Sequence, residues 1–319
     1  MMNVQTKPLE DAAAIVAELG RRAKSAAAAL RNASTGAKNR ALAEAARLIR
    51  AESAAILAAN ALDIAAAKKA GMNEAMQDRL LLNATRVEGM AKGLDDIVAL
   101  PDPVGALVEE WKRPNGLRIS RVRVPIGVIG VIYEARPNVT ADAGALCIKS
   151  GNVVVLRGGS DSFHSSRAIV ELIRRALAAA GLPEDCVQLV PTTDRAAVGE
   201  LLKAMDWLDL IVPRGGRSLI DRVTVESRVP VLRHYEGLCH VYVDRDADVA
   251  GVGHRVVVGH RLTDQNVAAL LAVGRLLDVE RGNHAGVARR VRVGRRRDVA
   301  RVVGVAAGHL GRVGDGIVH

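Results

Sequence analysis

The sequence predicts an α/β protein whose core is a doubly wound parallel sheet, preceded by a layer of helices and a β-hairpin. From residue 126 onward, short apolar runs rich in β-branched residues alternate with longer amphipathic stretches. Strands that are apolar on both faces and separated by helices are typical of parallel β-α-β units with a covered sheet. The chain of 319 residues is 49% hydrophobic and 25% charged, which suits one large or two ordinary domains.

The amino-terminal layer is predicted over residues 9–98, a region rich in alanine and leucine. Apolar side chains recur there at helical spacing, among them Leu42, Ala46, Ile49 and Ile56. Two extended runs then flank the tripeptide Pro114-Asn115-Gly116. Because Asn-Gly supplies the positive φ angles of a tight hairpin turn, we predict a β-hairpin over residues 108–124.

The strands of the sheet are predicted at residues 128–133, 153–157, 187–190, 208–212 and 240–244. A helix is predicted between the second and third strands, in the stretch SFHSSRAIVELIRRALAAAG. Ser160 and Asp161 are the candidates to cap its start, and Gly181 marks its end.

Ligands of doubly wound sheets bind beyond the carboxyl ends of the strands, so the residues that follow each strand are candidates for a site. The first strand leads through YEARPN to Asn138. The second strand ends in Arg157, Gly158, Gly159 and Ser160, and the fourth is followed by Pro213, Arg214, Gly215 and Gly216. Backbone N–H groups at helix amino termini and guanidinium groups all favour anions. The two Arg-Gly-Gly turns therefore predict a cradle for a phosphorylated ligand.

A guanidinium beside a ribose accommodates a 2′-phosphate, so Arg157 favours NADP over NAD as that ligand. A Gly-Gly turn is also an ordinary connection between a strand and a helix, and this alternative stays open. Neither GxGxxG nor GxxxxGK occurs, so the usual Rossmann fingerprint and the P-loop are not supported.

Charge and composition change sharply near residue 250. The net charge of the chain is +10, of which residues 251–319 carry +7 through twelve arginines and five acidic residues. The stretch RRVRVGRRR, residues 289–297, holds six of those arginines. Lysine, proline, cysteine and aromatic residues are absent from residues 251–319. We therefore divide the chain into an organised part, residues 1–250, and an atypical tail, residues 251–319.

Three interpretations of the tail are open. A run of arginines neutralises phosphates, as in a nucleic-acid-binding arm, but no aromatic residues interleave the charges, so a nucleic-acid partner is the least favoured. The segment QNVAALLAVGRLLD has helical spacing and indicates a small domain, although frequent glycines weaken a long helix. We favour the third interpretation, a frameshift or rearrangement of the gene, because the tail is dominated by residues that have GC-rich codons.

Cysteine usage and hydropathy exclude several classes of protein. The three cysteines, Cys147, Cys186 and Cys239, show no CxxC spacing, which predicts neither a disulfide framework nor a metal site and fits a reducing cytoplasm. No uninterrupted apolar stretch of about 18 residues occurs, so no membrane span is expected.

At the predicted site the sequence resembles the γ-glutamyl phosphate reductases, which belong to the aldehyde dehydrogenase superfamily. The likeness rests on RVPIGVIGVIYEARPNVTADAGALCIKSGNVVVLRGGSDS, LDLIVPRGGRSLIDRV and GLCHVYVDRDADV, and it runs from about residue 10 to about residue 250. The resemblance implies an enzyme of proline biosynthesis that reduces γ-glutamyl phosphate with NADPH to glutamate 5-semialdehyde and phosphate. An active-site cysteine would carry the acyl group as a thioester.

The resemblance also implies roles for the candidate residues. Residues 157–160 would border the adenosine side of NADP, and residues 213–216 would lie near its pyrophosphate and nicotinamide. Asn138 would donate its amide to the developing oxyanion, whereas the residues alone favour a helix cap at this position. The hairpin resembles the strands through which members of the superfamily oligomerise, which allows a homo-oligomer.

The chain departs from the family at the nucleophile. The family carries a segment of the form NAKTQR and then the catalytic cysteine after the strand at 240–244, but here no cysteine follows Cys239 and the catalytic domain is not recognisable. Cys147 and Cys239 are predicted to be buried, inert thiols, and Cys186 to lie in a surface-like turn beside two acids. His240 is predicted to be a core histidine rather than a base. We therefore expect very low reductase activity or, as the alternative, a non-catalytic NADP-binding protein.

Overall fold

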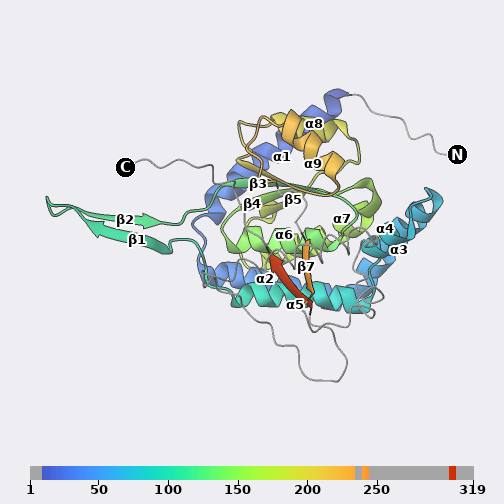
Figure 1. Cartoon of the computed structure of the whole chain (residues 1–319), viewed down its shortest axis with the longest axis horizontal. Helices are drawn as coiled ribbons and strands as arrows, with labels where there is room; N and C mark the ends of the chain where they lie inside the picture. Colours follow the sequence, from blue (N-terminus) through green and yellow to red (C-terminus); the bar gives the residue numbers. More distant parts are fainter. Residues whose placement is uncertain (1–8, 234–238, 244–301, 307–319) are drawn as a thin grey trace, which may run out of the picture. The chain divides into compact units, whose positions relative to one another are not determined.

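The predicted α/β class is confirmed by a computed structural model, which describes residues 9–233, 239–243 and 302–306. The chain divides into two compact units, residues 1–234 and 235–319. The first unit contains a four-stranded parallel sheet with the strand order β5-β4-β3-β6 and helices on both faces (Figure 1). Within the described residues, no helix is long and apolar enough to cross a membrane.

The two central strands are buried at every position. β3 (Val128–Tyr133) pairs with β4 (Val153–Arg157) on one side and with β6 (Leu210–Arg214) on the other, and β5 (Val187–Leu189) pairs with β4. The fourth predicted strand is displaced, since β6 begins at Leu210 rather than at residue 208. Asp209 belongs to the turn before it, where its carboxylate accepts a hydrogen bond from the Val128 N–H at 2.8 Å.

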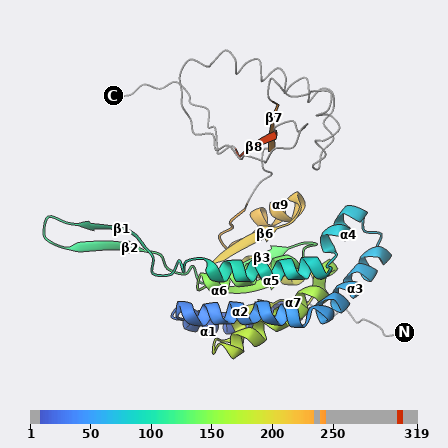
Figure 2. The same ribbon diagram turned by 90° about the horizontal axis from the view of Figure 1, so that it is seen from below.

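Helices cover both faces of the sheet, in two layers on one face and in one layer on the other (Figures 1 and 2). Two helices that connect neighbouring strands, α6 and α7, cover one face, and α2 and α5 pack outside them. The first helix, α1, lies on the other face with α8, so the predicted amino-terminal layer is divided between the two faces. The helices are α1 (Leu9–Leu30), α2 (Thr35–Ala51), α3 (Ser53–Lys69), α4 (Glu74–Leu80), α5 (Ala84–Ala99), α6 (Asn138–Lys149), α7 (Phe163–Ala179), α8 (Ala196–Lys203) and α9 (Arg217–Glu226).

The start of α7 is capped by a residue from a distant helix. Ser160 and Asp161 were the predicted caps, but they lie in a short 3₁₀ turn, η1 (Ser160–Ser162), and neither caps α7. The carboxylate of Asp63 in α3 accepts instead, from the backbone N–H groups of His164 at 3.1 Å and Ser165 at 2.8 Å. The prediction of the caps was therefore wrong, whereas Gly181 does follow the end of the helix, with a φ of 75°.

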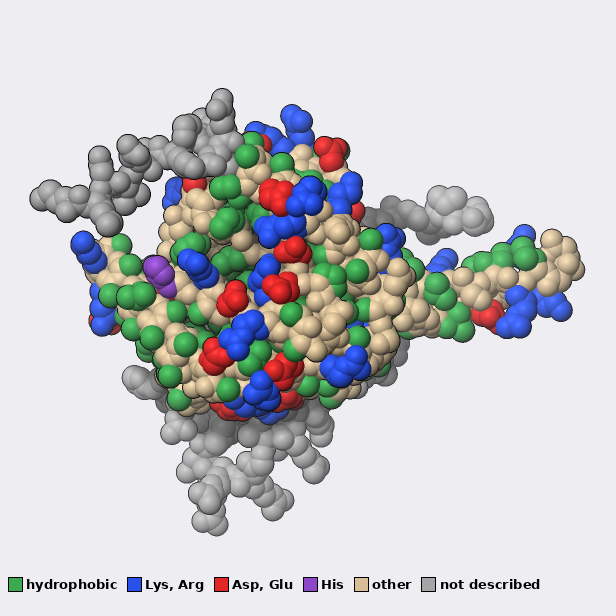
Figure 3. Space-filling model, turned by 180° about the vertical axis from the view of Figure 1, so that it is seen from behind, with side chains coloured by type: hydrophobic (Ala, Val, Ile, Leu, Met, Phe, Trp, Pro, Cys, Tyr) green, Lys and Arg blue, Asp and Glu red, His purple; other side chains and the backbone are tan. Residues whose placement is uncertain are grey.

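The predicted hairpin is confirmed, but its turn differs from the expected one. β1 (Leu107–Lys112) and β2 (Arg118–Val122) pair antiparallel and project from the body of the unit (Figures 1 and 3). Gly116 has a φ of 88°, whereas Asn115 is not in the left-handed region. The connection is therefore a three-residue loop closed between Arg113 and Leu117, whose third residue alone needs a positive φ.

Buried charges anchor the base of the hairpin. Lys38 of α2, with 1% of its side chain exposed, lies 2.6 Å from the carboxylate of Asp102 in the segment that leads to β1. Asp102 also accepts from the Thr35 hydroxyl at 2.7 Å and the Val104 N–H at 3.0 Å. Burial acts to raise the pKa of Asp102, but these hydrogen bonds outweigh it, so the pKa lies below its usual value.

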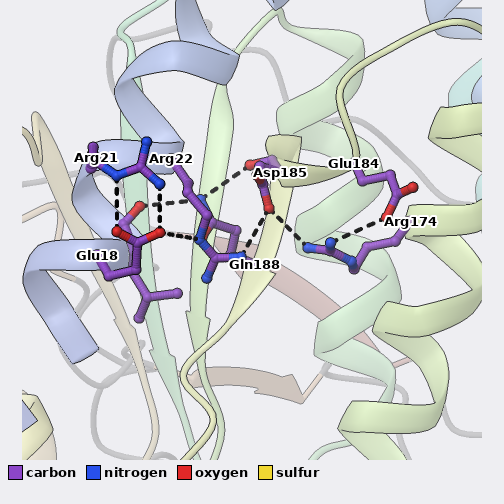
Figure 4. A network of polar contacts seen from close by, with 8 residues as sticks. Glu18, Arg21, Arg22, Arg174, Glu184, Asp185 and Gln188 are labelled. Carbon is purple, nitrogen blue, oxygen red and sulfur yellow. Dashed lines mark hydrogen bonds and ion pairs between the residues drawn. The ribbon is translucent and has the colours of Figure 1, made fainter. Parts of the chain in front are cut away.

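A polar network ties α1 to α7 at the open edge of the sheet (Figure 4). Asp185 lies in the 3₁₀ turn η2 (Glu184–Cys186) just before β5, and it accepts from Arg22 of α1 at 3.2 Å and from Arg174 of α7 at 3.0 Å. The side chain of Gln188, which is buried, donates to the Leu19 carbonyl at 3.3 Å. These contacts hold η2 and the edge strand β5 to α1 and α7.

In the second unit the structure describes one antiparallel pair, β7 (Cys239–Val243) with β8 (Val302–Ala306). The strand predicted at 240–244 is therefore found one residue earlier. The predicted division at residue 250 and most of the tail lie outside the described residues, so the interpretations of the tail remain predictions. The side chain of His240 is also outside the described part.

Candidate functional site

The two Arg-Gly-Gly turns lie at the same edge of the sheet, on either side of β3. The chain runs from β3 to β4 and β5, then returns to β6 on the other side of β3, so the strand order reverses there. Ile132 is opposite Arg157, and Tyr133 is opposite Arg214. With strands about 4.8 Å apart, the two turns are about 10 Å apart. Open α/β sheets bind ligands in the crevice at such a reversal.

The side chain of Arg157 lies beneath its turn rather than on the surface. It is 7% exposed, and its guanidinium donates to the carbonyls of Gly158 and, at 2.9 Å, Thr193. Burial lowers the pKa of Arg157, an effect that the nearby carboxyl of Asp161 opposes. The Nε–H of Arg157 is buried without a partner among the described residues. Arg157 therefore ties the end of β4 to the loop before α8 and keeps one donor unused.

Gly158 allows the turn to lie against a cluster of buried hydroxyls. A Cβ at this position would lie 3.1 Å from the hydroxyl oxygen of Tyr133. That hydroxyl is hydrogen-bonded to Thr140 at 2.6 Å and to Ser166 at 3.1 Å. The turn is thus supported from below by β3, α6 and α7, while Ser160 is exposed.

The second turn is occupied by a carboxylate that sequence reasoning missed. Gly216, which precedes α9, donates its backbone N–H to Glu134 Oε2 at 3.1 Å. The backbone N–H of Glu134 in turn donates to the Arg214 carbonyl at 3.1 Å. Glu134 is the first residue after β3, so its place at the carboxyl end of a strand was the available signal.

Arg195 is a second residue that the sequence analysis missed. It is exposed, precedes α8, and its charge lowers the pKa of Arg157 after the larger effects of burial and Asp161. The predicted site comprised only the ends of the first, second and fourth strands. The polar stretch PTTDR, which follows the third strand, was the overlooked signal.

Asn138 is the first residue of α6, so the alternative that it caps the helix is wrong; the cap position belongs to Pro137. Its side-chain amide donates to the carboxylate of Asp142, one turn later, at 3.1 Å. Burial raises the pKa of Asp142, which the hydrogen bond from Asn138 partly offsets. The role of Asn138 as an oxyanion donor stays a prediction.

An apolar groove of about 650 Å³ opens beside α6, between this helix, β3 and β6. This volume is in the range of small-molecule sites. Its wall includes Asp142 and Arg214, and the exposed apolar side chains along it are Val124, Ile126, Leu146 and Leu232.

The two cysteines whose side chains the structure describes, Cys147 and Cys186, are both buried. Cys147 is buried, as predicted, and burial raises the pKa of its thiol to about 12. The prediction for Cys186 was wrong, because η2 directs this residue inward and burial likewise raises its pKa to about 12. The parts of the chain that the structure describes contain no group of His, Cys, Asp and Glu that could hold a metal ion.

Comparison with known proteins identifies the family. The model of the aldehyde dehydrogenase family matches residues 3–265. The chain belongs to the aldehyde dehydrogenase family. Members of this family use a nicotinamide cofactor, and the parallel sheet with its covering helices is of the aldehyde dehydrogenase type.

Two curated relatives within the aldehyde dehydrogenases are both named γ-glutamyl phosphate reductase. The protein of Paramagnetospirillum magneticum is 57% identical and that of Rhodospirillum rubrum 58% identical, each over 239 residues. Each match covers 75% of this chain but 56% of the relative, so the chain spans little more than half the length of these proteins.

Solved structures of aldehyde dehydrogenases are also similar to this chain. The crystal structure of γ-glutamyl phosphate reductase from Thermotoga maritima is 43% identical, with a TM-score of 0.70 over 75% of this chain and 58% of that one. An acetylating aldehyde dehydrogenase from Geobacillus thermoglucosidasius, 16% identical with a TM-score of 0.59 over 78% of this chain and 52% of that one, shares the fold.

Proposed function

We propose that the chain binds NADP(H) across the two Arg-Gly-Gly turns, in the manner of a γ-glutamyl phosphate reductase, and that its own reductase turnover is very low. The observation that carries the first part is the strand register, which brings Arg157 and Arg214 to one edge of the sheet at the reversal of strand order. The second part rests on the cysteines, since both described thiols are buried and have strongly raised pKa values.

The residues present fit a dinucleotide. Arg157 keeps an unused Nε–H beside the first turn, and Gly216 presents a backbone N–H at the amino terminus of α9, so each turn has a donor of the kind that binds phosphates. Residues 157–160 would hold the adenosine side, and residues 213–216 would hold the pyrophosphate. When bound, NADPH supplies the hydride that reduces the substrate.

Arg195 supports NADP over NAD as the cofactor. The guanidinium of Arg157 donates hydrogen bonds to carbonyls of the β5–α8 loop. Arg195 lies exposed in the same loop, close enough for its charge to lower the pKa of Arg157. Two guanidinium groups, one below the turn and one at its rim, suit the extra 2′-phosphate of NADP.

Fluorescence titration of NADPH and NADH tests this assignment. The wild type should bind NADPH with saturation and more tightly than NADH. Arg195→Ala should weaken NADPH binding about tenfold and leave NADH binding nearly unchanged, because a charged hydrogen bond to the 2′-phosphate is lost. Arg175→Ala, which removes an exposed arginine paired with Glu52, is the matched control and should change neither. Absence of saturable binding, or equal weakening for both cofactors, would contradict the proposal.

γ-Glutamyl phosphate is the proposed substrate, by the names of the relatives. The groove beside α6 is large enough for it, and Asn138 begins the helix that lines this groove. The amide of Asn138 would stabilise the oxyanion after exchanging its hydrogen bond to Asp142 for one to the substrate.

A homo-oligomer through the hairpin is the proposed assembly. β1 and β2 are almost wholly exposed, with Leu107, Val108, Leu117 and Val122 each about half or more accessible at 48–59%. An isolated two-stranded hairpin is marginally stable in water, so these strands need a partner surface.

Sedimentation velocity tests the assembly. The wild type should sediment as a dimer or larger species, and Val122→Lys should shift it toward the monomer, because a charge enters the apolar strand. Val225→Lys, at an exposed position of α9, should leave the assembly intact. A monomeric wild type at micromolar concentration would refute this proposal.

A further inference from the structure

The backbone of Glu134 is held in place both before and after its Cα. Its backbone N–H is bonded to the Arg214 carbonyl at 3.1 Å, and Ala135, the next residue, is 3% exposed and has a φ of 47°. A positive φ is uncommon for a residue other than glycine, so the surrounding structure holds this bend. The bend directs the carboxylate of Glu134 over the turn between β6 and α9.

The carboxylate oxygen lies against the bare backbone of that turn. A Cβ on Gly215 would be 2.5 Å from Glu134 Oε2, the same oxygen that accepts the Gly216 N–H at 3.1 Å. Helix α9 has no acidic residue in its own first turn. Glu134 therefore supplies, from another strand, the negative charge that the amino terminus of α9 favours.

A ligand phosphate at this turn would meet the same backbone donor and an anion already present. A second carboxyl lies near: Asp161 has a raised pKa, chiefly through burial, and the charge of Glu134 contributes to it. A phosphate oxygen and the Glu134 carboxylate cannot both accept the Gly216 N–H without like charges being brought within a few ångström.

We propose that Glu134 is an internal anion that closes the second Arg-Gly-Gly turn, and that a phosphate-bearing ligand binds there only when the Glu134 side chain turns away. This inference rests on the proposed function, because it takes the turn to be the place of the cofactor pyrophosphate. Glu134 thereby sets the affinity of the site and discriminates against weakly bound anions.

Glu134→Gln separates the charge of this residue from its structural role. Glutamine has the same length and keeps an oxygen that can accept the Gly216 N–H, so the turn should keep its shape. NADPH and inorganic pyrophosphate should each bind at least about fourfold more tightly to Glu134→Gln than to the wild type, since two like unit charges about 5 Å apart repel by that factor even at the dielectric constant of bulk water. Glu226→Gln removes a carboxylate at the opposite end of α9 and should have no effect.

The two probes distinguish this inference from the proposed function. If the wild type binds NADPH but Glu134→Gln binds it equally or less well, Glu134 is no competitor and the inference is wrong, while the function stands. If neither protein binds NADPH but the variant binds pyrophosphate more tightly, the cofactor assignment fails and the role of Glu134 stands. No binding of either probe to Glu134→Gln overturns the inference.

Discussion

Phosphate-dependent reduction of NADP with glutamate 5-semialdehyde should be at least about 10³-fold slower than the roughly 1–10³ per second of ordinary enzymes. A thiolate is the attacking group in the reaction that the resemblance implies. With a pKa of about 12, Cys147 and Cys186 would each be ionised in only about one molecule in 10⁵ at neutral pH, and both are buried. No cysteine follows Cys239 in the sequence.

Cysteine variants make this prediction specific. Cys147→Ser and Cys186→Ser should leave the residual rate unchanged, because burial raises the pKa of both thiols to about 12, although Cys147 lines the groove beside α6. Cys239→Ser is the decisive variant, since Cys239 begins β7. Turnover in the ordinary range that disappears in Cys239→Ser would show that Cys239 is the nucleophile and that the expected loss of activity is wrong.

Replacing Asp102 by alanine should lower the free energy of unfolding by about 3–5 kcal/mol. The variant would leave Lys38, which is 1% exposed, charged and without its partner. It would also remove the acceptor of the Thr35 hydroxyl and the Val104 N–H at the base of the hairpin. Urea denaturation followed by circular dichroism measures the difference.

The effect should depend on pH with a definite sign. Because the pKa of Asp102 is lower in the folded than in the unfolded state, its contribution is fully present above its usual value of 3.8 and is lost as the pH falls through the folded-state pKa. Asp96→Ala removes an ion pair whose side chains are 66–68% exposed, and it should cost no more than about 0.5 kcal/mol. A loss below about 1 kcal/mol for Asp102→Ala would show that the pair is not an anchor.

Strands that are buried on both faces could be predicted from the sequence, whereas features that depend on residues distant in the chain could not. β3 and β4 were predicted with their observed bounds because both faces are buried, so apolar periodicity is decisive. The end of α7 could also be predicted, because it depends on a single local residue, Gly181, whose φ is positive. The capping of α7 by Asp63 was beyond local reasoning, since Ser160 and Asp161 fit the same pattern and only the packed helices decide between them.

The candidate site shows the same division. Its turns were found because strand ends meet at one edge of a parallel sheet, whatever their distance in the sequence. The direction of the Arg157 side chain and the inward turn of Cys186 depend on the loops that pack against them. The role of Glu134 depends on its contact with a turn 82 residues away in the sequence, which no local pattern indicates.

The capping of α7 by Asp63 also has a consequence for synthesis. The carboxylate and the Ser165 N–H that it accepts are 102 residues apart in the chain. At a synthesis rate of about 5–20 residues per second, α3 leaves the ribosome roughly 5–20 seconds before the start of α7, which Asp63 caps. During that interval a charged side chain destined for the interior stays in water. The amino-terminal helices can thus reach their final packing only after the strand that carries the first Arg-Gly-Gly turn has emerged.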